Sequence, residues 1–209
     1  MKKYYFSIML SIVVVFLPLS FESFNVQAVE NEETQLLTPV QIKEINVVLE
    51  ELRIQVNDRL NQGETDITVF GDLSFQEDPI SLTFQVEVPN ARFVAGQRNV
   101  SLLSAVQQRA NFRAEVHNTA GFNFSHLLTG SFLWGAGKIG NISYDATLHG
   151  ALYGKTHSTN VTRLDPSVAQ VSSVGKFRAL RFAPVEYTTH IVVELYGSGH
   201  YSLKRAVLG

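Results

Sequence analysis

In the segment NISYDATLHGALYG, residues 141–154, polar and apolar side chains alternate strictly from Asn141 to His149. The apolar positions begin at Ile142 and Tyr144 and continue through Leu152. Successive side chains of a strand point to opposite faces, so this pattern predicts one strand with an apolar face and a polar face. A strand of this length would span roughly 46 Å, which is more usual in a barrel or a strongly bent sheet than in a sandwich. Its apolar face must contact a protein core, a lipid bilayer or a ligand.

The same two-residue period begins after Gly63 and recurs to the end of the chain. The runs Ile67–Gln76 and Ile80–Val88 flank the turn residues 77–79 and predict a β-hairpin. Further strands are predicted near residues 112–117, 122–136, 141–154, 173–183 and 187–204. The segment 100–109 could form a short helix, and the polar segment 155–169 is predicted to be a loop. Helices and strands do not alternate along the chain, which argues against a parallel α/β sheet.

A helix is predicted over residues 38–63. Thr38 suits the N-cap, Pro39 the first helical position, Gln41 the capping box and Gly63 the C-terminus. Apolar residues recur three and four positions apart on one stripe, namely Ile42, Ile45, Leu49, Leu52 and Val56. We expect this stripe to pack across a sheet; the alternative is an interface for a protein partner.

The predicted fold class is therefore α+β and mainly β. One long N-terminal amphipathic helix precedes an antiparallel barrel or sandwich of about seven or eight strands. The domain boundaries that follow are a flexible acidic lead-in over residues 29–37, the helix over 38–63 and the β domain over 64–209.

Residues 1–28 have the features of a secretory signal peptide. Lys2 and Lys3 precede an apolar run, and Val26 and Ala28 place small residues where a signal peptidase cleaves. The alternative is an uncleaved membrane anchor, but the run is shorter than the roughly 20 residues that span a bilayer. We therefore expect an exported protein, either periplasmic or extracellular.

The chain contains no cysteine. This excludes thiol catalysis, Cys-ligated zinc and iron–sulfur chemistry, and an exported chain of this kind must be stabilised by burial alone. A small outer-membrane β-barrel is an alternative, because its strands alternate in the same way. The long amphipathic helix and the Gly and Ala residues on the later apolar faces argue against it.

Charge is distributed unevenly along the exported part. Residues 29–78 contain twelve acidic and three basic residues, whereas residues 79–209 contain six acidic and twelve basic residues. The densest basic clusters are Lys176, Arg178 and Arg181, followed by Lys204 and Arg205. These five residues are the candidate binding residues for an anionic glycan or lipid, and no nucleic acid is expected. Alternatively, the acidic and basic parts pack together and compensate each other.

We find no sequence motif for a catalytic serine, a phosphate loop, a zinc protease or a dinucleotide site. The six histidines lack the close spacing of metal ligands, and Asp145 and His149 would lie about 13 Å apart along one strand. No metal or cofactor is therefore predicted. A hydrolase would need a site assembled from distant residues such as His149 or His190, and its catalytic residues are unknown.

Aromatic residues occur in most of the predicted strands, including Trp134, Tyr144, Tyr153, Tyr187, Tyr196 and Tyr201. Such residues favour packing within a sheet, although they also suit stacking on a glycan. The sequence thus predicts a non-catalytic binding or interaction protein, with an anionic or amphipathic partner such as a glycan or lipid.

Overall fold

The structure is a computed structural model that describes residues 36–87, 107–119, 123–150, 153–179 and 185–209. These residues belong to one folded unit, 34–209. The predicted signal peptide, residues 1–28, lies outside the described residues. Residues 100–106 of the segment 100–109, which could form a short helix, also lie outside them, whereas Gln108 and Arg109 belong to a strand.

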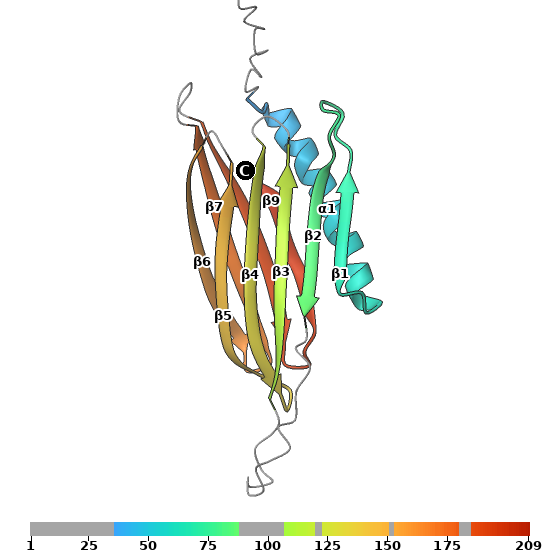
Figure 1. The fold of residues 1–209 in the computed structure, drawn as a ribbon, viewed down its shortest axis with the longest axis vertical. Helices are drawn as coiled ribbons and strands as arrows, with labels where there is room; N and C mark the ends of the chain where they lie inside the picture. Colours follow the sequence, from blue (N-terminus) through green and yellow to red (C-terminus); the bar gives the residue numbers. More distant parts are fainter. Residues whose placement is uncertain (1–35, 88–106, 120–122, 151–152, 180–184) are drawn as a thin grey trace, which may run out of the picture. The chain divides into compact units, whose positions relative to one another are not determined.

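The described part of the chain contains one helix and nine antiparallel strands, and the strands form two sheets (Figure 1). The elements are α1 (Pro39–Asn61), β1 (Asp66–Gly71), β2 (Ile80–Glu87), β3 (Gln108–Asn118), β4 (Phe124–Gly135), β5 (Lys138–His149), β6 (Tyr153–Asp165), β7 (Val168–Ala179), β8 (Glu186–Tyr196) and β9 (Tyr201–Leu208). The five-stranded sheet has the order β1-β2-β3-β4-β5, and the four-stranded sheet has the order β6-β7-β8-β9. The mainly β prediction is confirmed, and the two sheets make the architecture sandwich-like rather than a closed barrel.

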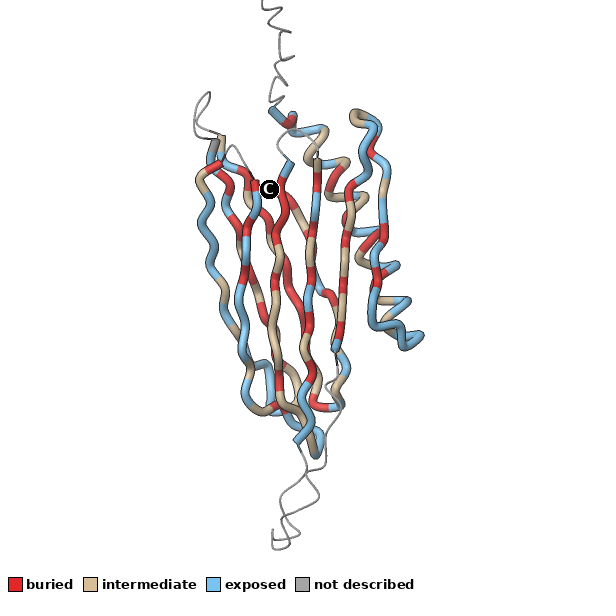
Figure 2. Tube along the Cα trace, viewed as in Figure 1, coloured by how far each residue is buried: buried red, intermediate tan, exposed pale blue. Residues whose placement is uncertain are grey.

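The predicted loop at residues 155–169 is wrong, because β6 covers residues 153–165. This strand lies at the edge of its sheet and is exposed along most of its length (Figure 2). Since neither face of β6 is fully buried, its sequence carries no apolar alternation. A pattern search that depends on one buried face therefore misses it.

The alternating run at residues 141–154 is two strands rather than one. β5 ends at His149, and β6 begins at Tyr153. Ala146 and Leu148 on the apolar face of β5 are buried, whereas Tyr144 on the same face is 41% exposed. One end of this face therefore contributes to the core, and its middle reaches solvent at the sheet edge.

Local sequence signals determine where helix α1 begins and ends. The Thr38 side chain accepts a hydrogen bond from the Gln41 backbone N–H, and the Gln41 side chain accepts one from the Thr38 backbone N–H. Pro39 occupies the first turn, where its missing N–H costs least. Gly63 follows the helix with a φ of 86°, which a glycine adopts without strain. The predicted capping box is confirmed.

The apolar stripe of α1 packs into the core of the chain itself. Ile45, Leu49, Leu52 and Val56 are buried, and Ile42 packs against them. The helix contacts β1 and β2 of one sheet and β9 of the other. The chain's own strands therefore cover the stripe that was considered as a partner interface. No helix in the described residues is long and apolar enough to cross a membrane.

Two asparagines of α1 bind the backbone at the free edge of β9. Asn46 donates to the carbonyl of Leu208 and accepts from its N–H, at 2.6 and 2.8 Å. Asn57 makes the same pair of bonds with Leu203, at 2.8 and 2.9 Å. Eleven helical residues and five strand residues both span about 16 Å, so the two amides match the strand in register. The helix thereby replaces a missing neighbouring strand.

Aromatic contacts join the two sheets across the core. The rings of Phe124 and Phe177 lie 5.4 Å apart, and those of Phe84 and Tyr201 lie 5.8 Å apart. At one end, three hairpin turns meet: the Ile139 N–H donates to Pro166 and the Gly197 N–H donates to Ser167. A methyl group at Gly197 would overlap the backbone of Gly137. Gly197 thus permits the close approach of two of these turns.

Candidate functional site

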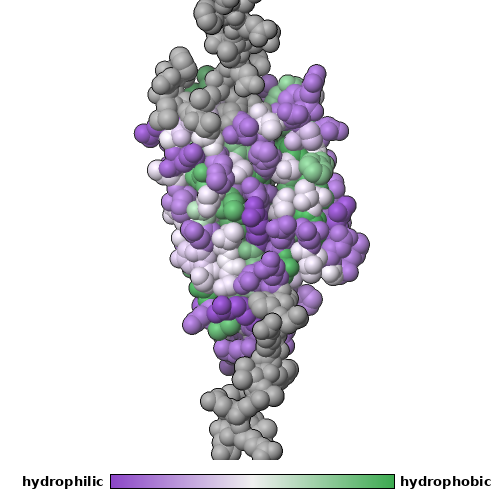
Figure 3. Space-filling view, in the orientation of Figure 1, coloured by the Kyte–Doolittle hydropathy of each residue, from purple (hydrophilic) through white to green (hydrophobic). Residues whose placement is uncertain are grey.

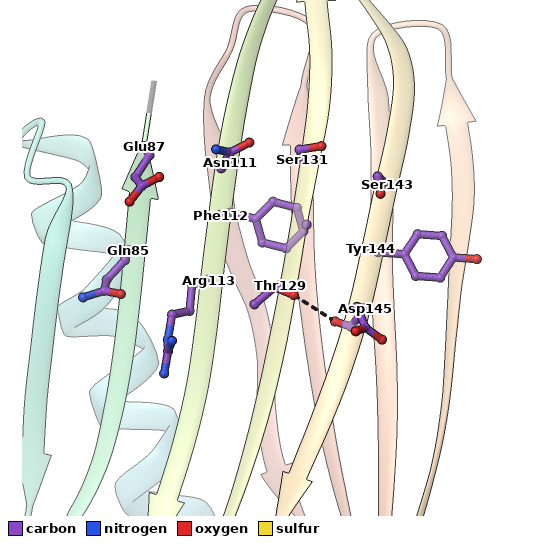
Figure 4. Close-up of a pocket in the computed structure, with 11 residues that line it drawn as sticks. Gln85, Glu87, Asn111, Phe112, Arg113, Thr129, Ser131, Ser143, Tyr144 and Asp145 are labelled. Atoms are coloured by element: carbon purple, nitrogen blue, oxygen red, sulfur yellow. Dashed lines mark hydrogen bonds between the residues drawn. The ribbon is translucent and has the colours of Figure 1, made fainter. Parts of the chain in front are cut away.

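A polar groove crosses the outer face of the five-stranded sheet, from β2 to β5. The strand register places Gln85, Arg113, Thr129 and Asp145 opposite one another in one row. A second row consists of Glu87, Asn111, Ser131 and Ser143. Figure 4 shows the two rows side by side across the four strands. Both rows alternate with buried residues, so the two-residue period of the strands directs them to this face.

The groove has a volume of about 440 Å³, within the range of roughly 300–1,000 Å³ that small-molecule sites occupy. Its two rows contain amides, hydroxyls, carboxylates and a guanidinium, and therefore both hydrogen-bond donors and acceptors. Hydrophilic side chains also predominate on the surrounding face, where hydrophobic ones form small, separate patches (Figure 3). This lining is suited to a ligand with many hydrogen-bonding groups.

Hydrogen bonds to neighbouring groups restrain three side chains of the first row. Arg113 Nη2 lies 2.6 Å from Glu115 Oε2, and Gln85 Nε2 donates to Asp66 Oδ1 at 2.9 Å. Thr129 donates to the carbonyl of Asp145 at 3.4 Å. Each bond restricts a side chain that would otherwise be mobile, so less conformational entropy is lost when a ligand binds.

Along the strands, Phe112, Gly130 and Tyr144 come between the two rows, and these positions belong to the opposite face of the sheet. The Phe112 ring occupies the space that a side chain at Gly130 would need, so a methyl group there would overlap it. Phe112 is buried, whereas Tyr144 is exposed. In Figure 4 the Tyr144 ring extends away from both polar rows at the β5 side of the groove.

The two carboxylates that line the groove lie at its opposite ends. Glu87 is on β2 and Asp145 is on β5, three strand spacings across the sheet and two residues along the strands, or about 16 Å apart. Glycoside hydrolysis by two carboxylic acids requires a separation of no more than about 9.5 Å. This pair therefore does not have the geometry of a glycosidase site.

The first predicted basic cluster is partly neutralised by an ion-pair network on the four-stranded sheet. Glu186 accepts from Lys176 at 3.0 Å and from Arg178 at 3.3 Å. The hydrogen bond from Lys176, with a smaller contribution from Arg178, lowers the pKa of Glu186. Arg181 lies outside the described residues. The structure thus places two of the three predicted cations together, but with a shared acidic partner.

The second basic cluster contains a further ion pair. Lys204 Nζ lies 3.0 Å from Glu194 Oε1, and this hydrogen bond raises the pKa of Lys204. Arg205 is exposed and pairs with Val192 of β8 in the strand register. Lys176 pairs with Thr188, which lies four residues earlier on the same strand. The two clusters therefore occupy separate parts of the sheet.

A buried histidine joins the two sheets and could not be located from the sequence. His126 on β4 makes hydrogen bonds to Thr189 Oγ1 at 2.7 Å and Ser173 Oγ at 2.9 Å. Burial, together with the nearby His157 and His190, lowers the pKa of His126 to about 4. Its partners are 47 and 63 residues away along the chain, so no local motif indicates them.

The remaining charged residues form no metal site in the part of the chain that the structure describes. There, no group of three or more His, Asp or Glu residues is arranged to hold a metal ion. Comparisons with protein-family models, curated proteins and solved structures found no match to this chain. The groove is therefore interpreted from its own geometry.

Proposed function

We propose that this protein is exported and binds glycans without catalysing a reaction, through the groove on β2–β5. The observation that carries the proposal is the pair of polar rows across four strands. A sugar presents several hydroxyl groups, each of which can donate and accept. A fixed lattice of amides, hydroxyls and carboxylates can satisfy many of these groups at once.

The composition of the groove favours a glycan over a lipid. An acyl chain needs an apolar wall, whereas eight of the eleven lining residues are polar. The partner expected from the sequence was a glycan or lipid at the basic residues. Ion pairs now occupy Lys176, Arg178 and Lys204, which makes the groove the better supported surface.

The proposal of binding without catalysis rests on the distance between Glu87 and Asp145. Each carboxylate can accept hydrogen bonds from sugar hydroxyls. Neither can assist the other across about 16 Å, so acid–base cleavage by this pair is not expected.

The test is isothermal titration calorimetry of the exported chain against a panel of soluble oligosaccharides. We expect at least one oligosaccharide to bind, and Asn111→Ala and Ser131→Ala each to weaken binding by about fivefold, since a lost hydrogen bond contributes about 1 kcal/mol. Thr83→Ala is the matched control. Thr83 lies on the same face of β2, outside the groove, and contacts Thr68. Equal losses in all three variants, or no binding by the unmodified chain, would refute the proposal.

A further inference from the structure

The charges that line the groove indicate which glycans it can hold. Arg113 is its cationic residue, and Glu115 already neutralises it at 2.6 Å. Among the described residues, neither Glu87 nor Asp145 has a cation within ion-pair distance. Within the described residues, both groove ends therefore carry negative charge without a paired cation, which would repel an anionic ligand.

The direction of the two rows indicates the shape of the ligand. Each row runs perpendicular to the strands and presents one polar side chain per strand, from β2 to β5. The rows are about 14 Å long, which exceeds the width of one sugar ring. A chain of linked sugars lying across the strands would meet polar groups over this whole length.

Tyr144 belongs to the opposite face of β5 from the two polar rows, and its exposed ring is an apolar surface that a chain passing over the β5 edge would meet. It is 41% exposed, and β5 is the last strand of its sheet. Its ring extends from the β5 side of the groove, as Figure 4 shows. An aromatic face of this kind can stack on the C–H groups of a sugar ring, while the polar rows bind hydroxyls.

We propose that the groove selects an uncharged glycan chain that lies across β2–β5, with Tyr144 stacking on a sugar ring at the β5 edge. This inference rests on the proposed glycan binding and adds the charge, the orientation and the aromatic contact.

The test measures binding of neutral β-linked gluco-oligosaccharides and N-acetylglucosamine oligomers of increasing length, beside oligogalacturonates of matched length. We expect affinity for a neutral series to rise from the monosaccharide to the longer oligomers. The matched oligogalacturonates should bind at least tenfold more weakly. Replacing Glu87 by Gln together with Asp145 by Asn should reduce this discrimination, because it removes both uncompensated charges.

Tyr144 is tested with the longest neutral oligomer that binds. Tyr144→Ala should weaken binding three- to tenfold, and Tyr144→Phe should retain it, because phenylalanine preserves the stacking face. The control is Phe70→Ala, which removes an exposed aromatic from β1, at the opposite edge of the same sheet. Circular dichroism verifies that each variant is folded.

Three results would overturn the inference in different ways. If oligogalacturonates bind as tightly as neutral oligomers, the charge selection is wrong, although glycan binding stands. If Tyr144→Ala behaves like Phe70→Ala, the stacking contact is wrong. If no oligosaccharide binds the unmodified chain, both the inference and the proposed function fail.

Discussion

His126 links the stability of the protein to pH. Its pKa is lowered from 6.5 to about 4 by burial, so the unfolded chain binds the proton more readily than the folded one. Stability from this residue is complete above pH 6.5, decreases as the pH falls toward 4, and changes little below that. The shift corresponds to about 3 kcal/mol of unfolding free energy.

We predict that urea unfolding will show about half of this loss between pH 6.5 and 5, above the range where carboxylates contribute. His126→Gln, which retains a donor and an acceptor, should flatten the dependence. His190→Gln should flatten the pH dependence less. Burial also lowers the pKa of His190, but His190 is only half-buried and therefore more accessible than His126. An unchanged slope in His126→Gln would contradict the assignment.

Asn57 stabilises the free edge of β9 through two backbone hydrogen bonds to Leu203. Asn57→Leu has a similar volume but leaves both backbone groups without this partner. We predict a loss of about 2–3 kcal/mol in unfolding free energy. Gln55→Leu on the exposed side of the helix should change it by less than about 0.5 kcal/mol. Similar effects in the two variants would show that the edge does not depend on this amide.

At the level of the elements, helix α1 has two apolar surfaces with different roles. Leu49 is buried against the sheets, whereas Val47 is 52% exposed. We predict that Leu49→Ala will cost about 2–5 kcal/mol in thermal or urea unfolding. Val47→Ala should cost less than about 0.5 kcal/mol. A larger effect at Val47 would mean that the outer surface of the helix is covered in solution.

Elements with local signals could be predicted from the sequence. Thr38, Pro39 and Gln41 specify the start of α1, and strict alternation specifies β2 because one of its faces is buried. β6 could not be predicted in this way. It has no fully buried face, so its sequence shows no apolar alternation, and no turn signal marks residue 155. The division of the 141–154 run into two strands was also missed, because the apolar positions of β5 continue in phase through Leu152, beyond the end of that strand at His149.

The candidate groove was harder to predict from the sequence than these elements. Tyr144 and Asp145 were recognised as members of opposite strand faces. The alignment of Asp145 with Gln85 depends on the pairing of four strands, and strand register is a long-range property. The basic residues were more prominent in the sequence, but their acidic partners Glu186 and Glu194 became evident only when the strands were paired.

At the level of the whole molecule, the proposed ligand surface and the predicted basic clusters lie on different sheets. We predict that Arg178→Glu will leave oligosaccharide binding unchanged, because Arg178 belongs to the four-stranded sheet. If the basic clusters instead bind an anionic partner, Arg178→Glu combined with Arg181→Glu should weaken that binding and its dependence on salt. Binding to anionic vesicles at increasing salt concentration measures this directly.

The proposed export is tested by expressing the chain together with residues 1–28. We predict that the chain expressed with residues 1–28 will be recovered, folded and β-rich, from the periplasm or medium without detergent. A requirement for detergent would favour the outer-membrane alternative and would contradict the proposed location.

The most direct test of glycan binding is to map the ligand on the folded chain by backbone amide NMR during titration with a neutral oligosaccharide that binds. The groove predicts that shift changes will concentrate at the outward-facing residues of β2–β5, including Asn111, Ser131 and Ser143. Changes centred on β7–β9, around Lys176 and Lys204, would place the ligand on the basic sheet and contradict the account.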